Sequence, residues 1–272
     1  MLGENRYGKA GIRLARLVRH LDRHDFKDVT VAVSFEGDFA AAHVSGDNTA
    51  VLPTDTMKNT VYAFAKKLPL DEIEPFGLAL AKHFLAENAG VVRVTIEVSE
   101  RPWKRISGQA FELPGREKRL AKVVAGREGS SVSSGLADLL IAKTSKSGFA
   151  GFKRDSFTTL PETADRILAT ALSAEWSYRE PDLPWGLLWR GVRQTLLETF
   201  AAHDSRSVQH TLHAMGEAVV ESQEAIAEIR LTMPNKHHLR ADLAPFGLEN
   251  ENEIFVPTEE PYGLIEATIR KG

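Results

Sequence analysis

The chain has 272 residues, of which 43% are hydrophobic and 26% charged, and its formal net charge is −3. This length allows one large domain or two similar lobes with a buried core, and the small net charge provides no basic field for nucleic acid. The absence of cysteine excludes disulfides, thiolate nucleophiles and cysteine-ligated metals, and it is compatible with a reducing compartment. Neither a secretory signal core nor a membrane-spanning apolar run is found, so we expect a cytoplasmic protein without membrane partners.

Alternating apolar residues predict two strands in the first half of the chain, around residues 29–35 and 92–98. Between them, an apolar stripe with helical spacing predicts a helix over residues 73–84. Residues 10–21 are ambiguous, because their apolar residues fit both periods, and their spacing by itself favours a helix.

The stretch Gly129 to Gly135 is rich in serine and glycine, and we predict a loop there that separates two lobes, residues 1–130 and 131–272. Periodicity in the second lobe predicts a short helix over residues 161–168, helices over 188–200 and 208–219, and strands over 229–233, 237–243 and 265–269. Each half thus contains strands and a helix pair, which is a weak internal repeat. Because the strands cluster rather than alternate with single helices, we predict an α+β fold with antiparallel sheets.

The segment from Pro53 to Thr60 concentrates hydroxyl, acidic and basic side chains between two apolar runs. Pro53 suits the residue before a helix or its first turn, and Thr54 or Asp55 can cap the free N–H groups there. A helix N-terminus also favours anions. The segment is therefore either a simple helix cap or part of an anion site.

Other candidate residues have ordinary structural interpretations beside the functional ones. Lys9 fits an exposed lysine, and Phe149 and Phe152 fit core aromatics. Arg166 falls inside the predicted short helix, where a solvated arginine is usual, and His237 fits a hydrogen-bonded core histidine. No metal-binding histidine motif, dinucleotide-binding glycine motif or phosphate loop is present. The residue types alone support an α+β protein with a polar ligand site.

An ordered set of motifs between residues 6 and 270 resembles urate oxidase (uricase). The matching segments are Arg6–Lys9, Thr54–Thr60, Gly151–Asp155, Phe157–Leu160, Asp165–Leu168, Ser207–Gln209 and Met233–His237. Each motif is weak by itself, but the shared order and spacing are highly specific. The resemblance implies tandem tunnelling-fold (T-fold) lobes, in which antiparallel sheets carry helix pairs and the sheets of associated subunits close a β-barrel. It also implies a strand over residues 10–21, against the periodicity.

The resemblance further implies that urate is oxidised by O2 and water to 5-hydroxyisourate and hydrogen peroxide. Residues that match a proton relay are Lys9, Thr54 and His237. Residues that match the substrate and oxygen site are Thr54, Asp55, Phe149, Arg166, Val208, Gln209, Asn235 and Ile265. No metal or organic cofactor is implied, because deprotonated urate itself supplies the electrons. The implied assembly is a homotetramer whose active sites are shared between chains.

Two alternatives stay open beside this interpretation. One is another T-fold enzyme that acts on a purine or pterin, such as a metal-dependent hydrolase with histidine and acidic ligands. The other is a catalytically inactive purine-binding barrel, against which the Lys9, Thr54 and His237 set argues. The sequence ends in Ile269-Arg270-Lys271-Gly272 and not in a peroxisomal Ser-Lys-Leu signal, so we expect a bacterial cytoplasmic enzyme.

Overall fold

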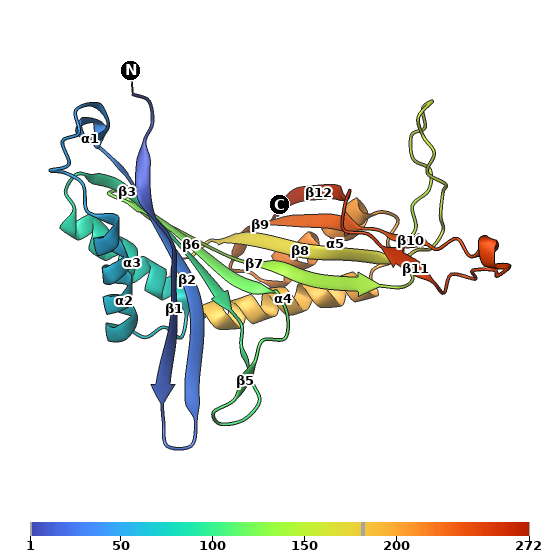
Figure 1. The fold of residues 1–272 in the computed structure, drawn as a ribbon, viewed down its shortest axis with the longest axis horizontal. Helices are drawn as coiled ribbons and strands as arrows, with labels where there is room; N and C mark the ends of the chain where they lie inside the picture. The colour runs from blue at the N-terminus through green and yellow to red at the C-terminus, as the bar shows by residue number, and fades with distance from the viewer. Residues whose placement is uncertain (1, 181–182, 272) are drawn as a thin grey trace. The chain divides into compact units, whose positions relative to one another are not determined.

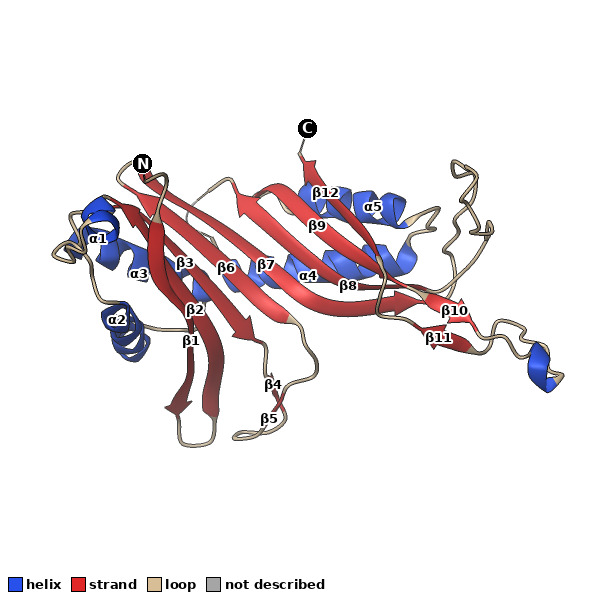
Figure 2. Cartoon of the chain, turned by 45° about the horizontal axis from the view of Figure 1, so that its top comes forward, coloured by secondary structure: helices blue, strands red, loops and turns tan. Residues whose placement is uncertain are grey.

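The computed structural model describes residues 2–180 and 183–271, and the chain divides into two compact units. The first unit comprises Met1–Gly135 and Ser177–Trp189, and the second comprises Leu136–Trp176 and Arg190–Gly272. Both contain antiparallel strands and α-helices (Figures 1 and 2). The predicted α+β fold with antiparallel pairing is therefore confirmed.

The sheet of the first unit contains strands hydrogen bonded in the order β1, β2, β3 and β6. Its elements are β1 (Arg6–Arg19), β2 (His24–Gly37), α1 (Ala40–Val44), α2 (Thr54–Lys67), α3 (Ile73–Glu87), β3 (Val91–Arg101), β4 (Lys104–Arg105), β5 (Phe111–Glu112) and β6 (Lys118–Gly126). Helix α3 packs on β3 and β6, and α2 packs on β1 (Figure 1). Strand β7 (Gly129–Lys143) contributes to both units, because the division falls within it.

Strand alternation and helix periodicity bury one apolar core in the first unit. Its members include Val29, Val31, Val33 and Phe35 of β2 and Ile73, Phe76, Leu80 and Phe84 of α3. The Phe35 and Phe84 rings meet edge to face, with centroids 5.2 Å apart. Val92 departs from the predicted alternation, since it is 50% exposed where the pairing of β2 with β3 shifts. The predicted strands and helix of this core are otherwise confirmed.

Residues 10–19 belong to β1, so the helix favoured by periodicity is wrong, and the strand that the resemblance implies over 10–21 is confirmed as far as Arg19. The pairing of β1 with β2 shifts by one residue between Lys9 and Ile12. The extra residue forms a bulge in which Gly11 has a φ of 69°. Because one extra residue reverses which side chains face the helices, the alternation breaks at the bulge.

In the second unit, β8, β9 and β12 are neighbours in the sheet. The elements are β8 (Leu168–Tyr178) and α4 (Trp185–Ala202), which the division of the chain also splits, and then α5 (Val208–Ser222), β9 (Ile226–Lys236), β10 (His238–Arg240), the 3-10 helix η1 (Ala244–Phe246), β11 (Phe255–Pro257) and β12 (Gly263–Arg270). Helix α5 packs on β9 and β12 (Figure 2). The contact is close, because a Cβ on Gly216 of α5 would lie 2.5 Å from Ile269 of β12.

The Ser/Gly-rich stretch Gly129–Gly135 is not a loop, because it forms the first half of β7. One of its serines, Ser134, is buried and donates a 2.6 Å hydrogen bond to the Glu74 carboxylate of α3. The serines that predicted a loop therefore lie in a strand, and the hydroxyl of one of them, Ser134, has a buried hydrogen-bond partner.

Two further local predictions in the second unit are wrong. Residues 161–167 are not helical, because the backbone of Thr163 pairs with that of Phe149, and Leu168 begins β8. The strand predicted over 237–243 is reduced to the three residues of β10, which pair with β11. Among the described residues, no helix has the length and apolar character needed to cross a membrane.

Candidate functional site

Helix α2 begins at Thr54, directly after Pro53, as the sequence predicts. The N-cap is Pro53, and no side-chain hydrogen bond caps the helix among the residues that the structure describes, so the capping role considered for Thr54 or Asp55 is wrong. Asp55 is the second helical residue, and its carboxylate instead accepts hydrogen bonds from Lys58 and, at 2.9 Å, from Nδ2 of Asn59. Both donors lie one helical turn further along, where side chains of one face meet.

Lys9 of β1 lies near this helix start. It pairs with Val33, whose side chain is buried beneath the helices, and opposite residues of an antiparallel pair share a face. The Lys58 hydrogen bond, foremost, and also the charge of Lys9 lower the pKa of the Asp55 carboxyl. An ammonium, an ionised carboxylate and the Thr54 hydroxyl thus gather at the N-terminus of α2.

In the second unit, four backbone hydrogen bonds join three segments that are distant in sequence. The Gly148 amide donates to the Ser205 carbonyl at 2.8 Å, and the Ser205 amide donates to the Lys146 carbonyl at 2.9 Å. Phe149 and Thr163 exchange both of their backbone hydrogen bonds, at 2.8 and 3.0 Å. The loop that carries Phe149 is therefore held between the segment before β8 and the segment before α5.

This pairing places an aromatic ring beside a guanidinium group. The Cζ atom of Arg166 lies 5.2 Å from the centroid of the Phe149 ring, and Phe152 stacks on Phe149 at 4.8 Å with an interplanar angle of 14°. Arg166 is half-buried and lies outside any helix or strand, and its Nε has no hydrogen-bond partner among the described residues. Burial lowers the pKa of the Arg166 guanidinium, but arginine keeps its charge in proteins.

The start of α5 adjoins the same segments. Ser207 is the N-cap, and its hydroxyl accepts a 3.1 Å hydrogen bond from the His210 amide. Ser205, which holds the Phe149 loop, donates from its hydroxyl to the Ser207 carbonyl at 2.9 Å. Val208 then opens the helix with only 3% of its surface exposed, and the following Gln209 is exposed.

The remaining candidates lie at the adjoining ends of β9 and β12. Asn235 is 8% exposed and pairs with Gly263. A Cβ on Gly263 would lie 3.6 Å from Cδ1 of Ile265 and 3.8 Å from Cβ of Asn235, so these side chains are close neighbours. His237 is half-buried and follows β9, and its carbonyl accepts a 2.9 Å hydrogen bond from the Thr258 amide.

The candidate residues therefore form three groups within the two units. The first unit holds Lys9, Thr54 and Asp55, and the second holds Phe149, Arg166, Val208 and Gln209 as one group and Asn235, His237 and Ile265 as another. Sequence reasoning assigned no role to Ser205, because its contribution depends on backbone pairing between distant segments. In the described part of the chain, no three histidine or acidic side chains are placed to hold a metal ion.

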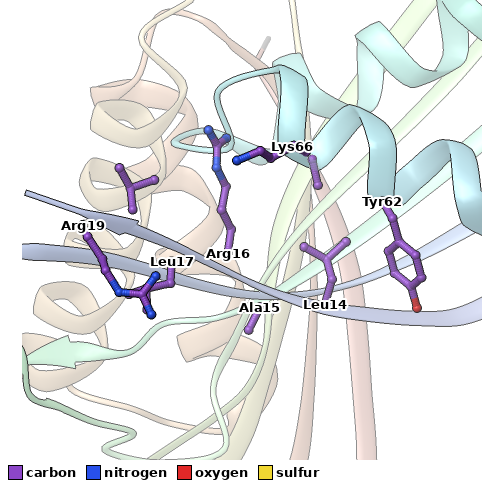
Figure 3. Close-up of a pocket in the computed structure, with 9 residues that line it drawn as sticks. Leu14, Ala15, Arg16, Leu17, Arg19, Tyr62 and Lys66 are labelled. Atoms are coloured by element: carbon purple, nitrogen blue, oxygen red, sulfur yellow. The ribbon is translucent and has the colours of Figure 1, made fainter.

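Among the surface depressions of the first unit, two include residues of β1. One, of about 550 Å³, is a groove between β1 and α2 lined by Leu14, Arg16 and Tyr62 among others, and it includes none of the candidate residues (Figure 3). The other, of about 640 Å³, lies along the sheet and includes Lys9 with Arg93 in its lining. The first unit thus contributes polar side chains at an open surface.

The family model described as Uricase matches residues 5–131 and 132–266 of the chain. Uricase from Arthrobacter globiformis is 42% identical over 100% of this chain and 90% of its own length, and uricase from Oryctolagus cuniculus is 36% identical over 97% and 93%. The crystal structure of the Arthrobacter globiformis enzyme superposes with a TM-score of 0.96, covering 100% of this chain and 95% of that one. A uricase from Bacillus fastidious, 22% identical, shares the fold with a TM-score of 0.86. The chain belongs to the uricase family.

Proposed function

We propose that this chain is a urate oxidase that converts urate, O2 and water to 5-hydroxyisourate and hydrogen peroxide without a metal or an organic cofactor. The family membership and the relatives named uricase support the activity. In this reaction urate loses two electrons to O2 and gains a hydroxyl from water, and two protons complete the peroxide. The protein therefore has to bind a planar anion, hold O2 and water above it, and move protons.

The observation that carries the substrate site is the Arg166 guanidinium 5.2 Å from the Phe149 ring. Urate is flat and has carbonyl and N–H groups along its edges. An aromatic ring stacks on its face, and a planar guanidinium pairs with its edge in bidentate fashion. The exposed amide of Gln209 offers a donor and an acceptor for the opposite edge, and Val208 with Ile265 closes the pocket.

The proton relay that we propose runs through Lys9, Thr54 and His237. Lys9 accepts a proton through the Thr54 hydroxyl, and His237 completes the chain of donors and acceptors. Asn235 and Thr54 hold O2 or water above the urate plane. Asp55, at the start of α2, belongs to the substrate site together with Thr54. The gathering of Lys9, Thr54 and Asp55 at one helix N-terminus supports this part of the proposal.

We further propose T-fold lobes at residues 1–130 and 131–272 and a homotetramer whose active sites lie between chains. Two consecutive matches to one family model support the paired lobes. Strands β1 and β12 end the strand order, so each leaves an edge without a strand partner among the described residues. Unpaired edges favour association with further strands. The cytoplasmic location expected from the sequence stays a prediction.

The decisive experiment is a urate absorbance assay coupled to peroxide detection, run with purified protein after exhaustive chelation. We expect equimolar urate loss and peroxide release at an unchanged rate. A strict requirement for added metal would contradict cofactor independence and favour the metal-dependent T-fold hydrolase. Urate binding without any turnover would favour the inactive purine-binding barrel.

A further inference from the structure

We infer that Asp165 is a positioning residue for the substrate site, because its carboxylate fixes the loop of Phe149 and the backbone of Arg166 to each other. This inference rests on the proposed binding of urate by Phe149 and Arg166. Asp165 itself is not proposed to contact the substrate. Its role follows from two hydrogen bonds to the main chain.

One carboxylate oxygen of Asp165 accepts both hydrogen bonds. Oδ1 accepts from the Ser147 amide at 3.0 Å and from the Arg166 amide at 3.1 Å. Ser147 lies two residues before Phe149 and is 1% exposed, so its amide depends on a protein acceptor. A single oxygen atom thus joins the segment that carries the ring to the segment that carries the guanidinium.

The two segments are packed without spare room at this point. A Cβ on Gly148 would lie 2.9 Å from the Ala164 carbonyl oxygen, so only glycine fits between Ser147 and Phe149. The Thr163 hydroxyl donates to the Asp165 carbonyl at 2.8 Å, which holds the turn that presents the carboxylate. Asp165 therefore lies two residues beyond the backbone pair of Thr163 and Phe149, and its carboxylate adds a further hydrogen bond between the same two segments.

The consequence falls on substrate binding. Loss of this acceptor oxygen leaves the buried Ser147 amide without a partner. The Phe149 loop and the Arg166 segment then lose their shared anchor. A ring and a guanidinium that bind one planar anion have to be held to within a fraction of an ångström.

The test compares Asp165→Ala with Asp165→Asn by the dissociation constant of urate without O2, where the bound substrate is not oxidised. We expect Asp165→Ala to raise this constant roughly ten- to a hundredfold, the scale of a small displacement in a preorganised site. Asp165→Asn keeps an acceptor oxygen at the same position. Its urate dissociation constant should therefore stay within about threefold of the wild-type value, which corresponds to a change of less than about 1 kcal/mol in the free energy of binding.

Asp155→Ala is the matched control. Asp155 lies in the same loop, and its carboxylate likewise accepts a backbone hydrogen bond, from the Phe157 amide at 2.9 Å, but it holds neither Phe149 nor Arg166. We expect Asp155→Ala to leave the urate dissociation constant unchanged. An equal loss of affinity in Asp155→Ala and Asp165→Ala would show a general effect of loop order and overturn the inference.

Phe149→Ala and Arg166→Ala separate this inference from the proposed site. If neither raises the urate dissociation constant, the site assignment is wrong. If both raise it and Asp165→Ala does not, or if Asp165→Asn binds as weakly as Asp165→Ala, the positioning role is wrong. Should Asp165→Ala fail to fold, Asp165→Glu displaces the acceptor by one methylene and should still weaken binding, so wild-type affinity in that variant would overturn the inference.

Discussion

The Arg166 guanidinium is half-buried, and its Nε has no hydrogen-bond partner in the part of the chain that the structure describes, so it loses solvation that these residues do not replace. Arg166 tolerates this beside the Phe149 ring, and a bound planar anion would supply the missing acceptor. The residue thus has the environment of a ligand-binding group. The positive charge of Arg166 is therefore already positioned beside Phe149 before the substrate binds.

Replacement of Arg166 by alanine should therefore mainly weaken urate binding. A hydrogen bond to a charged group contributes about 1.5–3 kcal/mol, so we expect a roughly ten- to hundredfold higher dissociation constant without O2. The matched control is Arg154→Ala, because Arg154 also lies over an aromatic ring, that of Phe152, at 5.5 Å, and has no proposed substrate role. A similar loss of affinity in both variants would contradict the assignment of Arg166.

Lys9 should affect the chemical step more than binding. A positioned acid or base contributes about 10²–10⁴-fold to a rate, so Lys9→Met should lower kcat by a factor in that range with a smaller change in KM. Steady-state kinetics across pH measure both effects. The control is Lys66→Met, because Lys66 of α2 lines the groove of Figure 3 and has no proposed role in catalysis. This variant should retain kcat. An unaltered kcat and pH profile in Lys9→Met would remove lysine from the relay.

Elements with uninterrupted periodicity are predictable from the sequence, and those shaped by distant contacts are not. The stripes of α3 and α5 match buried faces, because one side of each helix packs on a sheet. The bulge at Gly11 interrupts the alternating pattern by which β1 could be recognised in the sequence, because one extra residue exchanges the two faces of the strand. Arg166 lies outside any helix, in a segment whose Thr163 pairs with Phe149, and no local pattern encodes that pairing.

The candidate site divides in the same way. Its residue types follow from motifs that resemble the uricase family, and the start of α2 at Thr54 follows from Pro53. The approach of Arg166 to Phe149 arises from hydrogen bonds that also involve Ser205, far along the chain. Short-range reasoning assigns Arg166 to a solvated helix surface, because it does not include those partners.

Pairing between β1, β2 and β3 also sets a pH dependence of stability. Burial by itself would raise the pKa of the Asp28 carboxyl, but hydrogen bonds from Arg13 and Trp103 and the charge of Arg101 lower it below its usual value. A carboxyl whose pKa is lowered by folding stabilises the protein above its unfolded pKa of about 3.9. That contribution is lost as the pH falls through the folded pKa.

Asp28→Asn should accordingly reduce the free energy of unfolding at pH 7 by on the order of 1–2 kcal/mol, since Arg13 is partly solvated. The difference from wild type should shrink as the pH is lowered below about 4. Denaturant unfolding at several pH values measures it, with Asp71→Asn at an exposed site as the control. A constant difference at all pH values would mean that the charge of Asp28 is not responsible.

At the scale of the whole molecule, the candidate residues are divided between the two compact units. Lys9, Thr54 and Asp55 belong to the first unit, and the aromatic, arginine, amide and histidine candidates belong to the second. The proposed homotetramer completes each active site with the first unit of one chain and the second unit of its neighbour. A two-fold interface would then create two equivalent sites in every pair of chains.

Thr54→Ala and Arg166→Ala test this arrangement because each removes a group from a different half-site. Assayed at a urate concentration below the wild-type KM, where weakened binding lowers the rate, each variant alone should have little activity, since every site in its homo-oligomer carries one lesion. In a mixed pair, one shared site carries both lesions and the other carries neither, so activity should reappear up to the fraction of mixed pairs. Co-expression with two different tags, purification of doubly tagged oligomers and a urate assay measure this recovery. If both half-sites belonged to one chain, every site would keep a lesion, and the doubly tagged oligomer would be no more active than its parents.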